Sequence, residues 1–379
     1  MSGIYLHIPF CKQACSYCDF YFVTRQADKQ QFVDELIREI QSKKESAFVS
    51  EPVQTIYFGG GTPSQLSPAQ VESILKAIEG TFPLQLKEVT FEMNPDDVTK
   101  PYLKDLKQAG ITRASMGVQS FDTGLLAFMH RAHTAEEALA CLRLLRESDL
   151  EEFTVDLIYG NPGQTLEMLK KDIETILKFN PPHVSAYSLT IEPKTRLGKQ
   201  FTMGKLIVPE DDIVAQHFDL VAELLQQAGI LQYEVSNYAK PGSEAVHNSN
   251  YWEHVNYLGF GPGAHSFWWD VDGQTAKRWS NEPNLRNYLG RQWITPHEKE
   301  TLTLPILAEE RLMLALRTRK GISLDELEMR YKFIFNQAQK AFLCRLKEEG
   351  KVFINEKISL TQKGLKIADS ILIDLLVKT

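Results

Sequence analysis

The stretch HIPFCKQACSYCDF, residues 7–20, follows a short apolar run at residues 4–8, near the start of the chain. Three of the five cysteines in this 379-residue sequence fall within it: Cys11, Cys15 and Cys18. The other two, Cys141 and Cys344, stand alone, and an odd cysteine count in a chain of this length argues against a disulfide framework. The sequence therefore predicts a β-strand followed by a loop of reduced thiols.

Beyond this loop, β-branched and aromatic runs alternate with amphipathic segments up to about residue 190. The expected strands are 4–8, 53–58, 88–93, 113–118, 153–158 and 183–189. The expected helices lie near 28–47, 68–80, 99–110, 134–148 and 166–179, with Gly80 and Gly110 placed as C-cap glycines. This alternation predicts an α/β fold of parallel strands joined by right-handed crossovers. Six strands favour an open three-quarter barrel or a doubly wound sheet.

Polar and glycine residues collect where the expected strands end, for example in GGGTP at 59–63, EMNP at 92–95, GVQS at 117–120 and YGNPG at 159–163. Asp156 lies within the fifth strand. Any one of these groups is equally well a turn signal. Because the carboxyl ends of parallel strands share one rim, the groups together predict a binding site there.

The pattern changes after about residue 195. A helix is expected at 209–229 and a strand at 232–235, whereas 237–293 holds all five tryptophans and many Gly, Pro and Asn residues. We expect that part to be irregular structure packed over the barrel mouth. Three helices, a hairpin and a last helix then suggest a winged-helix-like unit: 308–317, 323–331, 335–349, 352–354 with 357–360, and 362–377. The expected domains are 1–200, 201–300 and 301–379.

Charge and hydropathy restrict the function classes. The net charge is −7, so the chain lacks the positive field of a general nucleic-acid binder, and the mixed charges of the last unit favour docking over DNA binding. No apolar stretch reaches the roughly 18 residues of a membrane span, and the first residues do not resemble an export signal. A cytoplasmic protein is expected. Both a monomer and a dimer are compatible with the sequence.

The three clustered thiols have the spacing C-x3-C-x2-C, for which three readings stay open. Three thiolates hold three irons of a 4Fe–4S cluster and leave the fourth iron free for another ligand. A structural zinc site needs a fourth ligand, which would have to be His7, Cys141 or Cys344. In the third alternative, the three thiols stay reduced and bind no metal. The spacing favours the iron–sulfur cluster.

This spacing, in a loop after the first strand, resembles the radical S-adenosylmethionine superfamily over about residues 4–200, whose fold is a partial (β/α)6 barrel. The strings YLHIPFC (5–11), GGGTP (59–63), SMGVQS (115–120) and DLIYG (156–160) are similar to the oxygen-independent coproporphyrinogen III oxidase family. The resemblance implies that S-adenosylmethionine chelates the open iron, and that an electron from a donor cleaves it to a 5′-deoxyadenosyl radical.

The resemblance also implies which residues bind the cofactor. Tyr5, Gly60 and Glu92, with His265 as a further contributor, would line the first S-adenosylmethionine. The positions matching a second S-adenosylmethionine of the oxidase are Gln119, Arg131, Asp156, Tyr17, Gly61 and Thr62.

Two departures set the chain apart from the oxidase. The oxidase has a further cysteine in a C-x-C end, where this chain reads Cys18-Asp19-Phe20, and it has a longer segment before the first strand. Both match the subgroup of heme chaperones called HemW. The string HNSNYW at 247–252 is similar to the H-N-x-x-Y-W motif of that subgroup. The resemblance implies a protein that binds heme and transfers it to an acceptor protein.

His247 is the candidate heme ligand, because imidazole is a good axial ligand for heme iron. A planar porphyrin also packs well against aromatic side chains. Those walls would come from Tyr251, Trp252, Tyr257, Phe260, Phe267, Trp268 and Trp269. A core histidine with satisfied hydrogen bonds is the alternative, and His254 and His265 are competitors nearby. For the whole protein, a heme carrier is favoured over a radical enzyme that decarboxylates the propionates of coproporphyrinogen.

Overall fold

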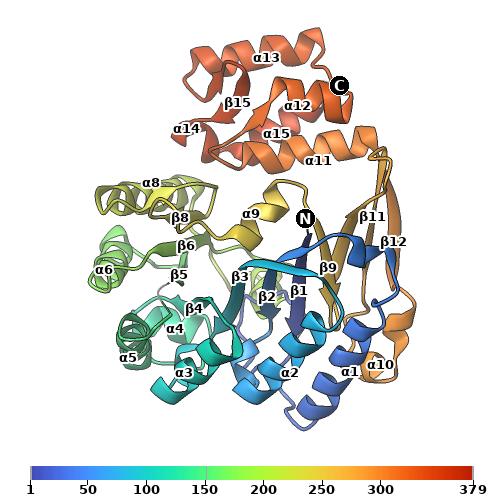
Figure 1. Ribbon diagram of the computed structural model, residues 1–379. Helices are drawn as coiled ribbons and strands as arrows, with labels where there is room; N and C mark the ends of the chain where they lie inside the picture. The colour runs from blue at the N-terminus through green and yellow to red at the C-terminus, as the bar shows by residue number, and fades with distance from the viewer. Residues whose placement is uncertain (1, 151, 378–379) are drawn as a thin grey trace.

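The computed structural model describes residues 2–150 and 152–377, and one large sheet runs through most of it (Figure 1). Within these residues the sheet has twelve strands in the order β12-β11-β10-β9-β1-β2-β3-β4-β5-β6-β8-β7. The six strands β1 to β6 pair in parallel, one after another. Their bounds are β1 (Ser2–Ile8), β2 (Val53–Gly60), β3 (Leu84–Met93), β4 (Arg113–Gln119), β5 (Glu152–Tyr159) and β6 (His183–Ser188).

Helices follow the parallel strands, as the sequence predicts: α1 (Lys29–Gln41), α2 (Pro68–Glu79), α3 (Lys100–Ala109), α5 (Ala135–Arg146) and α6 (Leu166–Leu177). Capping boxes at Ser67 and Thr134 start α2 and α5 by satisfying free backbone N–H groups. Gly110 ends α3 in the left-handed conformation at φ 111°, whereas Gly80 keeps a helical φ of −73° and is not a left-handed cap. The expected helix 28–47 stops earlier, at Gln41.

Several short helices in and around the barrel were not predicted. They are α4 (Thr123–Phe128), α7 (Arg196–Thr202) and the 3-10 turns η1 (Ala47–Ser50), η2 (Pro63–Gln65), η3 (Pro95–Asp97) and η4 (Gln292–Ile294). The α/β class and the partial (β/α)6 barrel are confirmed. Strand β4 is buried along its whole length, which is typical of a parallel sheet with both faces covered.

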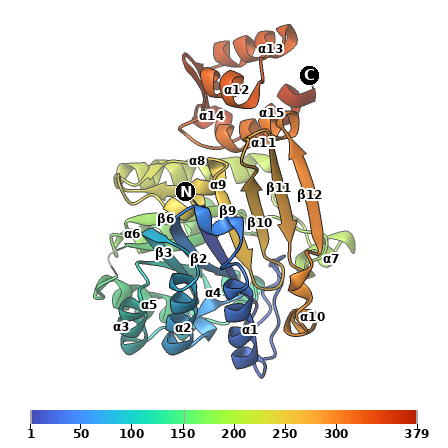
Figure 2. The ribbon, with the colours of Figure 1, turned by 45° about the vertical axis from the view of Figure 1, so that its right-hand side comes forward.

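The expectation of irregular structure over the barrel mouth at 237–293 is wrong. This part continues the sheet: β9 (Asn256–Phe260) pairs in parallel with β1, and β10 (His265–Trp269), β11 (Thr275–Ser280) and β12 (Glu298–Thr303) follow in antiparallel order (Figure 2). The strands are short and end in Gly, Asn and Pro turns, so that their alternation is hard to see in the sequence. Helix α10 (Leu285–Leu289) lies between β11 and β12.

The other sheet edge carries β8 (Asn237–Ala239) and β7 (Leu231–Gln232), which replace the longer strand expected at 232–235. Helix α8 (Asp211–Gln227) matches the expected helix 209–229. Helix α9 (Val246–Trp252) carries the HNSNYW string and contacts β2 and β3. Figure 1 places α9 beside the start of β1, at the end of the barrel opposite the strand ends where the thiol loop begins.

The C-terminal unit, residues 304–377, lies over the end of the barrel where the strands start (Figures 1 and 2). It consists of α11 (Leu304–Leu316), β13 (Ile322–Ser323), α12 (Leu324–Tyr331), α13 (Gln337–Glu348), β14 (Val352–Ile354), β15 (Lys357–Leu360), α14 (Gln362–Leu365) and α15 (Ala368–Val377). The sheet order β13-β15-β14 completes a winged-helix-like arrangement. The expected last helix is divided into α14 and α15.

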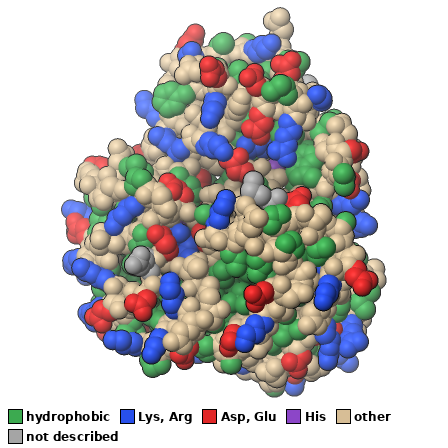
Figure 3. All heavy atoms as spheres, viewed as in Figure 1, with side chains coloured by type: hydrophobic (Ala, Val, Ile, Leu, Met, Phe, Trp, Pro, Cys, Tyr) green, Lys and Arg blue, Asp and Glu red, His purple; other side chains and the backbone are tan. Residues whose placement is uncertain are grey.

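Acidic and basic side chains are interspersed over the face of the C-terminal unit that Figure 3 shows. Among the described residues, no helix is both long enough and apolar enough to cross a bilayer.

Candidate metal and cofactor site

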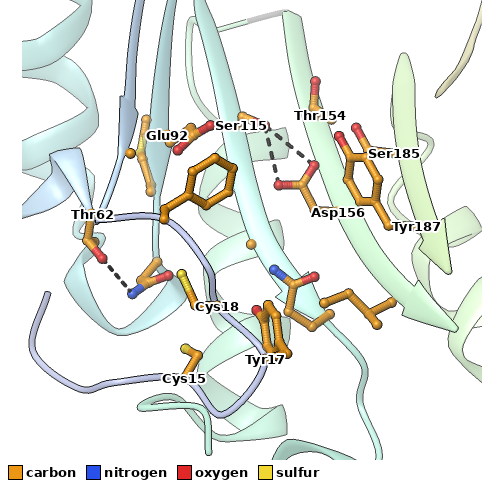
Figure 4. Close-up of a pocket in the computed structure, with 18 of the residues that line it drawn as sticks. Cys15, Tyr17, Cys18, Thr62, Glu92, Ser115, Thr154, Asp156, Ser185 and Tyr187 are labelled. Atoms are coloured by element: carbon orange, nitrogen blue, oxygen red, sulfur yellow. Dashed lines mark hydrogen bonds between the residues drawn. The ribbon is translucent and has the colours of Figure 1, made fainter. Parts of the chain in front are cut away.

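A cavity of about 550 Å³, called the barrel cavity here, lies inside the six parallel strands. It extends along the strands, because it is lined by the first residue of β4, Arg113, as well as the last, Gln119. Figure 4 shows side chains of the loop at 11–18, the thiol loop, facing residues of β5 and β6 across this space. Residues of the strand ends and the three thiols therefore line one cavity.

All three thiols of the thiol loop line the barrel cavity. Thr62 Oγ1 lies 3.4 Å from Cys11 Sγ, and Arg131 Nη1 lies 3.4 Å from Cys15 Sγ, each as a donor. The loop is also held by the end of α4, since the Ser16 hydroxyl donates to the carbonyl of Phe128, the last residue of that helix, at 2.9 Å. Two of the three sulfur atoms that line the cavity thus have a nearby donor that favours the thiolate.

Two of the thiols, Cys11 and Cys18, are protonated at neutral pH when no metal is bound. Burial raises the pKa of Cys11 to about 11 and that of Cys18 to about 12, and the Thr62 hydroxyl and the Phe20 backbone only partly oppose this. Because iron binds thiolates, loading of this site releases protons.

The zinc reading needs a fourth ligand, and its three candidates lie elsewhere. None of them is among the residues that line the barrel cavity. The His7 Nε2 donates to the Tyr21 carbonyl at 2.8 Å, Cys141 is buried against Met116, and Cys344 is exposed on α13. Three thiols beside an open cavity fit a 4Fe–4S cluster that leaves one iron to a small ligand.

Two carboxyl groups face the barrel cavity further along the strands. The Tyr57 hydroxyl donates to Glu92 Oε1 at 2.6 Å, and the Ser115 hydroxyl is 3.5 Å from both oxygens of Asp156 (Figure 4). Burial raises the pKa of Glu92 to about 7 and that of Asp156 to about 7. A bound cation, such as the amino or sulfonium group of S-adenosylmethionine, favours the ionised form of both.

Buried polar atoms without a partner also point into this space. Within the described residues, Gln119 Oε1 and Arg131 Nε are buried and make no hydrogen bond. Gln119 has a left-handed backbone at φ 67°, an uncommon conformation for this residue type. Unsatisfied groups of this kind in a cavity are typical of a site that awaits a polar ligand.

Most of the predicted cofactor residues come together here. The barrel cavity is lined by Tyr17, Gly60, Gly61, Thr62, Glu92, Gln119, Arg131 and Asp156. Tyr5 does not line it but stacks on Tyr57, which does, with ring centroids 6.1 Å apart. His265 is exposed at the start of β10, outside the lining.

Sequence reasoning missed the lining residues Tyr57, Thr154, Ser185 and Tyr187, and it assigned no individual part to Asn94 and Ser115, which lie in quoted strings. A signal was present in β4 to β6, because polar residues there recur at every second position, as in Ser185 and Tyr187. Such alternation marks the inward face of a strand. Asn94 belongs to the strand-end string EMNP, and it accepts from Arg131 Nη2 at 2.8 Å.

His247 lies at the other end of the barrel and is buried. Its ring nitrogens are both hydrogen-bonded, to Thr55 Oγ1 at 2.8 Å and to the Tyr251 hydroxyl at 2.9 Å. The ring stacks on Tyr57, and burial lowers the pKa of His247 to about 3, so the imidazole is neutral. This arrangement is that of a core histidine with satisfied hydrogen bonds, and heme ligation by His247 would require one of the two bonds to break.

Comparison with known proteins agrees with this architecture. Residues 5–176 match the Radical SAM superfamily and residues 302–367 match the HemN C-terminal domain. The heme chaperone HemW of Lactococcus lactis is 34% identical over 378 residues, which are 98% of this chain and 96% of that protein. The chain belongs to the HemW family. HemW of Bacillus subtilis is 32% identical with 98% of each chain covered, and HemW of Escherichia coli is 38% identical over 69% of each.

Among solved structures, the fold matches coproporphyrinogen III oxidase (HemN) from Escherichia coli with a TM-score of 0.82 and 23% identity, over 100% of this chain and 90% of that one. At this identity the likeness concerns the fold. As a HemW-family protein with a radical SAM domain, the chain uses a 4Fe–4S cluster and S-adenosylmethionine. The thiols, carboxyl groups and unpartnered polar atoms of the barrel cavity fit both groups.

Proposed function

We propose that this protein carries heme and passes it to an acceptor protein that lacks heme. The observation that carries the proposal is similarity to HemW heme chaperones over nearly the whole chain, including both the barrel and the C-terminal unit. The position of α9 adds support, because the HNSNYW string lies at the barrel end that the C-terminal unit covers, away from the thiol loop.

In this proposal the thiol-loop end serves the cofactors. Cys11, Cys15 and Cys18 hold the iron–sulfur cluster, which together with S-adenosylmethionine supplies one-electron chemistry when an external donor reduces it. The carboxylate of Glu92 binds the amino group of S-adenosylmethionine, and the Tyr57 hydroxyl orients the Glu92 carboxylate. Gly60 lines the same part of the cavity.

The remaining predicted residues take lesser or separate parts. Gln119, Arg131 and Asp156, with Tyr17, Gly61 and Thr62, offer polar contacts to a second small ligand in the same cavity. Tyr5 acts by supporting Tyr57, and a part for His265 stays a prediction. The proposed division is a cofactor domain at 1–200, a linking region at 201–300 and a closing unit at 301–379, in a cytoplasmic protein.

The carrier and the oxidase are separated by one pair of assays. Protein loaded anaerobically with iron and sulfide is titrated with hemin, and the Soret band is followed as hemin is passed to apomyoglobin. In parallel, the same preparation is incubated with coproporphyrinogen III, S-adenosylmethionine and a low-potential reductant.

We expect saturable hemin binding, transfer to apomyoglobin faster than hemin release into buffer, and no protoporphyrinogen. Formation of protoporphyrinogen at many turnovers would overturn the carrier proposal, and so would absence of saturable hemin binding.

A further inference from the structure

A second cavity, of about 500 Å³, lies where α9 and the strands β9 to β11 meet α11 of the C-terminal unit. Its volume is in the range of about 300–1,000 Å³ that small-molecule sites occupy. The barrel cavity and this second cavity share no lining residue. The second cavity is lined by Tyr251, His254, Val255, Tyr257, Phe267, Arg278, Glu310, Met313, Leu314 and Arg317.

The walls of the second cavity suit a flat apolar molecule with acidic groups at its edge. Tyr251 and Tyr257 pack edge to face with centroids 4.7 Å apart, and α11 adds apolar side chains opposite them. Two partly exposed arginines lie at the rim: Arg278 pairs with Glu300 and Glu310, and Arg317 pairs with Asp369, so a ligand carboxylate would replace the exposed Glu300 or Asp369. Arginine binds carboxylates in a two-pronged geometry, which suits propionate side chains.

One imidazole faces this cavity. His254 follows α9 directly, has a left-handed backbone at φ 58°, and stacks on Phe267 with centroids 4.8 Å apart. Its Nε2 lies 3.4 Å from Glu310 Oε2, a longer contact than the 2.9 Å mode of N–H···O bonds. Burial lowers the pKa of His254, although Glu310 opposes this, so the ring is neutral at pH 7.

The contrast with His247 is informative, because the two bonds of His247 are 2.8 and 2.9 Å long and stay inside the protein. Nε2 of His254 is the weakly bonded nitrogen, and its partner does not depend on it. Glu310 remains paired with Arg278 at 2.6 Å when the contact to His254 is lost.

We propose that the second cavity is the heme-binding site and that His254 Nε2 ligates the heme iron. This inference rests on the proposed heme-carrying function. The bond from iron to Nε2 replaces the long contact to Glu310, and the ring proton resides on Nδ1, which faces the Tyr331 hydroxyl at 3.3 Å. His247 is then a positioning residue: it fixes the hydroxyl of Tyr251, which forms one wall.

The test compares single variants of the full chain by hemin titration, with the Soret and visible bands reporting the axial ligand. His254→Ala is expected to bind hemin at least about tenfold more weakly and to lose the imidazole-ligated spectrum. Free imidazole added to this variant restores that spectrum. His247→Ala keeps the imidazole-ligated spectrum, and His297→Ala, which changes an exposed histidine outside both cavities, matches wild type.

A second pair of variants guards against misfolding of His254→Ala. Leu314→Trp fills the second cavity and is expected to reduce hemin binding at least about tenfold, whereas Ile306→Trp on an exposed face of the same helix leaves it unchanged. Circular dichroism confirms folding of each.

The outcomes separate the two proposals. If wild type does not bind hemin saturably, the proposed function itself fails. A different outcome is that wild type binds hemin while both His254→Ala and Leu314→Trp bind it equally well and with the same spectrum. In that case the heme-binding site is not the second cavity. Loss of the imidazole-ligated spectrum in His247→Ala alone would also overturn the inference and assign the ligand to His247.

Discussion

The thiol loop presents three sulfur atoms to one cavity, but each has a different neighbour. Cys11 is beside the Thr62 hydroxyl and Cys15 beside the Arg131 guanidinium. A 4Fe–4S cluster that is held by only three cysteines is destabilised by the loss of any one of them. We therefore expect Cys15→Ser to retain at least about tenfold less iron and sulfide than wild type after anaerobic reconstitution.

The matched control for this prediction is Cys344→Ser, which changes an exposed thiol of the C-terminal unit. It should retain a wild-type content of iron and sulfide. A full iron–sulfur content in Cys15→Ser would show that the thiol loop does not hold the cluster.

The carboxyl group of Glu92 links pH to stability. Its folded pKa of about 7 lies above the unfolded value, so its contribution to stability is complete below about pH 4.5 and is lost as the pH rises through 7. In protein without cofactors, Glu92→Gln should exceed wild type in free energy of unfolding at pH 8 by about 2 kcal/mol, a discounted figure because the group faces the cavity. The two should converge at pH 4.5.

Urea titrations at several pH values measure this, with Glu79→Gln at an exposed position of α2 as the control. The raised pKa of Glu92 would be contradicted if the difference in free energy of unfolding between Glu92→Gln and wild type stayed constant from pH 4.5 to pH 8.

At this scale the sequence predicted the residues that sit in distinctive strings, such as Cys11, Gly60 and Asp156. It did not predict Tyr57, whose part depends on two other strands: it stacks on Tyr5 of β1 and donates to Glu92 of β3. Nor did it predict that both nitrogens of His247 are occupied, because Thr55 is far away in the chain.

At the scale of elements, α9 begins without a side-chain cap of its own, and Glu88 of β3 takes that place. Its carboxylate accepts from the backbone N–H groups of Val246 at 2.8 Å and His247 at 2.9 Å, and it lies 3.7 Å from Arg113 Nη1. Glu88→Ala should lower the free energy of unfolding by about 3 kcal/mol, since it leaves two backbone donors without their acceptor and removes one of the two carboxylates that pair with the buried Arg113.

Urea unfolding measures the loss, and amide hydrogen exchange should be faster at residues 246 and 247. Glu72→Ala breaks an exposed pair with Lys76 on α2 and should change stability by less than about 0.5 kcal/mol. If Glu88→Ala matches that small effect, the carboxylate does not anchor α9.

The elements of the first half were predicted well because strands and helices there have clear local periods and caps, as at Ser67 and Thr134. The strands β9 to β12 were missed for a physical reason. Their pairing partners, such as β1 for β9, are distant in sequence, and their length of five or six residues is too short for a clear alternation.

At the scale of the whole molecule, Arg311 of α11 joins the C-terminal unit to the barrel. This buried guanidinium donates to the Trp252 carbonyl at 2.7 Å, to Glu253 at 3.2 Å and to Glu326 at 2.8 Å. Arg311→Ala removes this link, takes away the Arg311 partner of Glu326, and leaves Glu253 paired with Lys320 alone. We expect a loss of about 3 kcal/mol and a separate, earlier melting of the C-terminal unit by calorimetry.

Lys320→Ala is the matched control, because Lys320 pairs with the same Glu253 from an exposed position and should contribute less than about 1 kcal/mol. A single unshifted transition in Arg311→Ala would mean that apolar contacts alone hold the two parts together.

The parallel pairing of β1 with both β2 and β9 has a consequence for synthesis on the ribosome. Strand β1 is translated long before β9, so one of its edges stays open until residues 256–260 have emerged. The backbone N–H of Leu285, which bonds the hydroxyl of Tyr21 beside the thiols, emerges later still. The native surroundings of the thiol loop are therefore complete only after residue 285 has been translated, and we expect stable binding of the cluster to follow that point.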